Sequence, residues 1–87
     1  MKHKIYLTSS IENITEDAVE IGAASSFDAA CRIIHEFLDS KDFRKDKYWR
    51  YCMCDNATFI DFGSWSRFIA IAPPFDTTEM FGDRACI

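Results

Sequence analysis

Two cysteines, Cys52 and Cys54, stand two residues apart in the stretch R-Y-C-M-C-D-N at positions 50–56. On a β-strand, side chains two apart point to the same face, so both sulfurs would lie on one side with their Cα atoms about 6.5–7 Å apart. A disulfide between them would be strained at that spacing. Two thiolates can instead supply half of the four ligands of a tetrahedral zinc ion. We therefore expect Cys52 and Cys54 to be either metal ligands or free thiols.

The other zinc ligands would have to come from distant parts of the chain. Cys31 and His35 are four residues apart, so on a helix they share one face and form one candidate pair. The tail offers a second pair, Cys86 with His3 or His35. The expected structural zinc site combines the strand cysteines with Cys86 of the tail and one histidine: Cys52, Cys54, Cys86 and His35.

Strand alternation favours the tail over the helix as the source of these ligands. Trp49, Tyr51 and Met53 form the more apolar side of the strand predicted at 48–54. The cysteines should therefore face away from the helix. Without a metal, the four cysteines would be reduced thiols, and free cysteines usually behave as small buried hydrophobes.

Other motifs do not indicate an enzyme. Asp61-Phe62-Gly63 spells the metal-binding tripeptide of protein kinases, but the catalytic loop and lysine that must accompany it are missing. We expect it to be a strand that ends in a glycine turn. Neither histidine lies in a recognisable nucleophile and base pattern, and there is no glycine-rich loop for phosphate.

Composition favours one folded domain spanning residues 1–87. Apolar residues make up 48% of the chain and aromatic residues 15%, which is typical of a packed globule. No apolar run is long enough for a membrane helix or a signal-peptide core, so we expect a soluble cytoplasmic protein. The net charge of −4 disfavours direct nucleic-acid binding and suits a basic protein partner.

Hydrophobic periodicity predicts an α+β fold. The helix is expected at 26–41, because apolar residues recur there at spacings of three and four after Ser25 or Ser26, either of which can cap it. Alternating or β-branched runs predict strands at 3–8, 18–24, 48–54, 58–62 and 67–72. We expect one main helix on a four- to five-stranded, mostly antiparallel sheet, with the last three strands forming a meander.

One stretch resembles a known class of protein. Y-W-R-Y at 48–51, followed by T-F-I-D-F-G-S-W-S-R-F-I-A-I at 58–71, looks like the strand-turn-strand ending of small phage and prophage proteins of Gram-positive bacteria. Short acidic proteins of that origin include anti-CRISPR inhibitors of Cas9. The four cysteines and two histidines suggest similarity to a metal-binding member of that group.

The resemblance implies a phage-encoded anti-CRISPR protein in the host bacterial cytoplasm. It would inhibit Cas9 by stoichiometric protein binding and block guide or target DNA loading, with zinc as a structural cofactor. The expected partner-binding residues are acidic, with one tryptophan at a turn: Glu12, Glu16, Asp17, Glu20, Asp39, Asp42, Asp46 and Trp65. The alternative is a small phage regulatory or host-takeover module that binds another protein, or itself, without metal.

Overall fold

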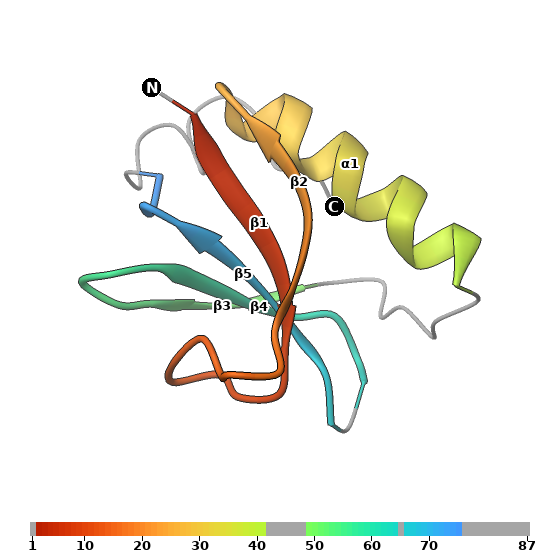
Figure 1. The fold of residues 1–87 in the computed structure, drawn as a ribbon. Coiled ribbons are helices and arrows are strands. Elements are labelled where there is room, and N and C mark those ends of the chain that lie inside the picture. The colour runs from red at the N-terminus through yellow and green to blue at the C-terminus, as the bar shows by residue number, and fades with distance from the viewer. Residues whose placement is uncertain (1, 42–48, 65, 76–87) are drawn as a thin grey trace.

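The chain forms a five-stranded antiparallel sheet with one helix packed on it (Figure 1). This computed structural model describes residues 2–41, 49–64 and 66–75. In chain order the elements are β1 (His3–Thr8), β2 (Val19–Ala24), α1 (Phe27–Ser40), β3 (Arg50–Met53), β4 (Thr58–Asp61) and β5 (Phe68–Ala72). The predicted α+β fold and the antiparallel β3-β4-β5 meander are confirmed.

The sheet order is β2-β1-β5-β4-β3, so the first strand lies beside the last. β1 pairs with β5 through partners such as Lys4 with Ala72 and Thr8 with Phe68. On its other side β1 pairs with β2, and the register shifts between Ile5 and Tyr6 at a β-bulge. The sequence predicted the strands but not this placement of β1 between β2 and β5.

The helix begins after Ser26, whose extended backbone and side chain form the N-cap. Ser26 Oγ accepts a hydrogen bond from the amide of Ala29 at 3.2 Å, which satisfies one of the free amides of the first turn. The buried helix residues recur at spacings of three and four: Phe27, Ala30, Cys31, Ile34 and Leu38. This apolar stripe packs the helix against the sheet.

The two faces of the sheet carry different clusters. The face under α1 holds the main core, in which Ile5, Ile60 and Ile69 are fully buried. The opposite face holds a smaller cluster of Ala57, Phe59 and Ala70, against which Cys52, Cys54, Tyr6, Ile11 and Ala72 pack. Phe59 and Ile60 fall into different clusters because successive strand residues point to opposite faces.

The Asp61-Phe62-Gly63 stretch is a turn, as the sequence predicted. β4 ends at Asp61, and Gly63 adopts a φ of 105°, which favours glycine. The amide of Gly63 donates to Asp61 Oδ1 at 3.0 Å, so the carboxylate serves to close the turn. The helix in the described part of the chain is too short and too polar to cross a membrane.

Candidate functional site on the face opposite the helix

A pocket of about 420 Å³ lies on the face opposite α1, between the β1–β2 loop and the β3–β4 turn. We call it the loop–turn pocket. Its lining comes from two segments far apart in the sequence: Glu12, Asn13 and Ile14 from the loop, and Cys54, Asp55, Asn56, Ala57 and Phe59 from the turn and β4. The strand order brings them together, because β1 and β4 both flank β5.

The β1–β2 loop is held in place by its own polar side chains. Thr8 Oγ1 lies 3.0 Å from Thr15 Oγ1 and accepts from the Thr15 amide at 3.0 Å. Ser9 Oγ donates to Asp17 at 2.9 Å and accepts from Arg67 at 2.6 Å. Hydrogen bonds from Thr15 and Ser9 lower the pKa of Asp17. Asp17 therefore organises the loop that carries one wall of the pocket.

The β3–β4 turn forms the other wall. The amide of Cys54 donates to the carbonyl of Ala57 at 3.0 Å, which closes a tight hairpin with Asp55 and Asn56 at its tip. Asp and Asn favour such tips because their side chains bond locally and tolerate left-handed backbone. The hairpin thus places an exposed carboxylate, that of Asp55, at the pocket edge.

Cys54 lines this pocket and Cys52 lies beside Cys54, with the two Sγ atoms 3.7 Å apart. Both are free thiols and half-buried. The hydrogen bond with Cys52 raises the pKa of Cys54, and burial and the negative charges of Asp55 and Glu12 add to the effect. Strand alternation correctly predicted that these cysteines face away from the helix.

The described part of the predicted zinc set does not come together. His35 is on α1, where its ring stacks on Trp49 at a centroid distance of 4.6 Å, on the other side of the sheet from the cysteines. Cys86 lies outside the described residues. Within residues 2–41, 49–64 and 66–75 no group of three His, Cys, Asp or Glu side chains could hold a metal. The zinc site with Cys86 stays a prediction.

The two alternative ligands for that site have other contacts. The expectation of four reduced cysteines is wrong for Cys31, which is buried and disulfide-bonded, so its sulfur offers no thiolate to a metal. His3 is buried, its Nδ1 lies 2.6 Å from the carbonyl oxygen of Pro73, and its ring stacks on Phe75 at 3.7 Å. His3 therefore joins the start of β1 to the segment after β5.

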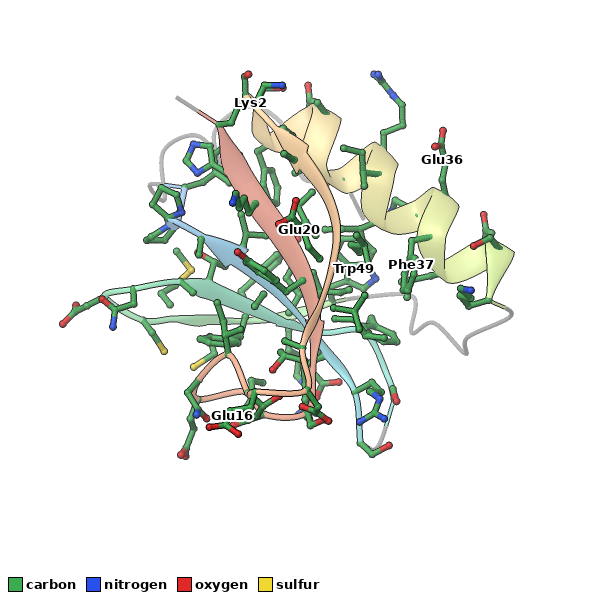
Figure 2. All side chains as sticks on the ribbon, in the orientation of Figure 1. Lys2, Glu16, Glu20, Glu36, Phe37 and Trp49 are labelled. Carbon is green, nitrogen blue, oxygen red and sulfur yellow. The ribbon has the colours of Figure 1, made fainter. Side chains whose placement is uncertain are left out.

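The acidic residues predicted to bind a partner are spread over the molecule. Glu12 lines the loop–turn pocket, and Glu16 is exposed in the same loop (Figure 2). Glu20 on β2 pairs with Lys4 at 3.8 Å, and Asp39 is exposed near the end of α1. The remaining three residues of the predicted set lie outside the described residues: Asp42, Asp46 and Trp65.

Sequence reasoning missed Asp55 as a site residue. It was assigned only to a turn, because nothing local links residue 55 to residue 12. The available signal was the D-N tip of a hairpin beside two cysteines, which predicts an exposed carboxylate next to the thiols.

Comparisons with known proteins found no relative of this chain. No protein-family model matches the chain, and neither a curated protein nor a solved structure is significantly similar to it.

Proposed function

We propose that this chain is a protein-binding module whose loop–turn pocket receives a basic segment of its partner. The partner is a basic, nucleic-acid-handling effector such as Cas9, and the chain acts as a phage-encoded anti-CRISPR protein. It binds stoichiometrically and blocks guide or target DNA loading. The observation that supports this proposal is the pocket, which joins two carboxylates to an apolar lining.

The pocket chemistry suits a lysine or arginine side chain. Glu12 and Asp55 are both exposed lining residues, and neither forms an ion pair with another residue that the structure describes. Their carboxylates are therefore available to a cation. Ile14 and Ala57 offer apolar surface to the methylene stem of such a side chain, while its charged head remains at the edge.

A binding titration with purified Cas9 tests the proposal. We expect Glu12→Lys and Asp55→Lys each to weaken binding by about tenfold or more, because like charges would then meet at the interface. Affinity should also fall as salt is raised, since these charges are exposed to solvent. Inhibition of DNA cleavage by Cas9 should fall in parallel with the loss of binding.

The matched control is Glu36→Lys, which makes the same charge change on the exposed side of α1 (Figure 2). It should bind like the wild type. Binding that survives both pocket substitutions, or that all three weaken equally, would contradict the pocket as the contact. If Cas9 does not bind but a different host protein is captured through the pocket, the alternative of another phage regulatory module would replace the Cas9 proposal.

A further inference from the structure

We infer that Cys52 and Cys54 form a two-sulfur binding site for a soft divalent metal ion of the zinc class, open to the loop–turn pocket. This site differs from the closed zinc site that the sequence suggested, because it needs neither His35 nor Cys86. It also does not depend on the identity of a protein partner.

The distance between the two sulfurs carries the inference. Zinc–sulfur bonds of about 2.3 Å at the tetrahedral angle place two sulfur ligands about 3.8 Å apart. Cys52 Sγ and Cys54 Sγ are 3.7 Å apart. A disulfide would instead require about 2.05 Å. The two sulfurs, now joined by a hydrogen bond between thiols, therefore have the separation of two vertices of a thiolate-bound tetrahedron.

The hairpin explains why this spacing is held. Cys52 lies in β3 opposite Phe59, and Cys54 follows β3 with its amide bonded to Ala57. Both side chains pack against the buried cluster that contains Phe59, so their positions are set by the sheet. A site built on a strand and a tight turn loses little freedom when it binds an ion.

The surroundings suit an open site. Cys54 lines the 420 Å³ pocket, so the remaining ligand positions face a space that can hold water or a small ligand. Glu12 and Asp55 line the same pocket and add negative charge that attracts a divalent cation. Within the described residues no third His, Cys, Asp or Glu joins this pair, so water or a small ligand would fill the other positions.

Binding would convert both thiols to thiolates. Two S–H bonds break, two metal–sulfur bonds form and two protons pass to the solvent, with no oxidation or reduction. Affinity should therefore rise with pH, because the metal competes with protons for the sulfurs.

Titration of the full chain with Cd²⁺ tests the site. Sulfur-bound Cd²⁺ has an ultraviolet charge-transfer band that oxygen-bound Cd²⁺ lacks, and we expect this band to saturate at one ion per chain. Cys52→Ser and Cys54→Ser should each lower the affinity by more than about tenfold, since even the loss of an outer-shell partner costs about 10–100-fold. In the wild type, bound Cd²⁺ should also protect both cysteines from iodoacetamide, a readout that needs no variant to fold.

Two controls separate this site from a closed one. Met53→Leu removes the sulfur of the residue between the two cysteines and should leave the titration unchanged, as should His35→Gln. Loss of the band in His35→Gln would overturn the two-sulfur site in favour of a closed set. Absence of the band in the wild type, or no protection of Cys52 and Cys54, would overturn it altogether.

Discussion

Gly22 is a residue for which the packing leaves little room for a side chain. A methyl group at this position would lie 2.8 Å from Ile33 Cγ2, closer than real Cβ atoms approach a neighbour. Ile33 cannot yield easily, because a β-branched side chain on a helix has one strongly preferred rotamer. Gly22 therefore lets α1 approach β2 closely.

Gly22→Ala should lower the free energy of unfolding by about 1–3 kcal/mol, the usual cost of overpacking. Chemical denaturation followed by circular dichroism measures the change. In the double variant Gly22→Ala with Ile33→Ala, the clashing Cγ2 atom is gone. The free energy of unfolding should therefore fall by less than the sum of the two single-variant losses. Fully additive losses would show that the contact does not set the helix position.

Because Tyr51 is partly buried, we expect its ionisation to lower the free energy of unfolding at alkaline pH. Burial raises the pKa of Tyr51 from 10.0 to about 12. The unfolded chain therefore gives up this proton at a lower pH than the folded chain. The contribution of Tyr51 to the free energy of unfolding should be fully present below about pH 10 and should decline as the pH rises to about 12.

Urea denaturation across this pH range checks the prediction. Tyr51→Phe keeps the ring that lies 6.2 Å from Phe27 and removes the titrating hydroxyl. The variant should lose less stability than the wild type between about pH 10 and about pH 12. Equal losses in both proteins would assign the alkaline decline to other groups.

Among the elements, the helix start depends on one side chain. Ser26→Ala removes the hydrogen bond to the Ala29 amide and should cost about 1 kcal/mol of stability. Ser25→Ala is the matched control, because Ser25 is exposed one position earlier and should change stability by less than about 0.5 kcal/mol. Thermal unfolding of both variants distinguishes them, and equal shifts would be inconsistent with Ser26 as the cap.

The elements were largely predictable from local patterns. Ile5 and Leu7 alternate with polar neighbours and gave strand β1 with its observed bounds, and the recurrence from Phe27 to Leu38 gave the helix to within a residue or two. The alternation of Tyr51 with Cys52 also gave the face on which the cysteines lie. These features depend on neighbours in the sequence, which a single chain displays.

The site was predictable only in part. Cys52 and Cys54 share the β3 end of one hairpin, so their proximity could be read from spacing. Glu12 and Asp55 line one pocket only because β1 inserts between β2 and β5, and that strand order leaves no local signal. His35 was placed in the zinc set although helix periodicity and strand alternation already predicted it on the other side of the sheet from the cysteines, where the structure places it.

At the scale of the whole molecule, the strand order predicts a gradient of protection from hydrogen exchange. β5 is bonded on both sides, by β1 and β4, whereas β2 and β3 are the two edges of the sheet. Amides of Ile69 to Ile71 should therefore exchange most slowly, and those of Arg50 to Met53 much faster. Exchange followed by mass spectrometry tests this, and equal protection of β3 and β5 would contradict the order.

The pairing of β1 with β5 also has a consequence for the nascent chain. Lys4 cannot meet Ala72 until the segment that contains β5 has left the ribosome, and at ~5–20 residues per second that takes roughly 3–14 s after β1 is made. During this interval β1 and β2 can form a hairpin, but the other edge of β1 has no partner strand. The newly made chain thus exposes an open hydrogen-bonding edge, a site prone to aggregation, until the segment that contains β5 has left the ribosome.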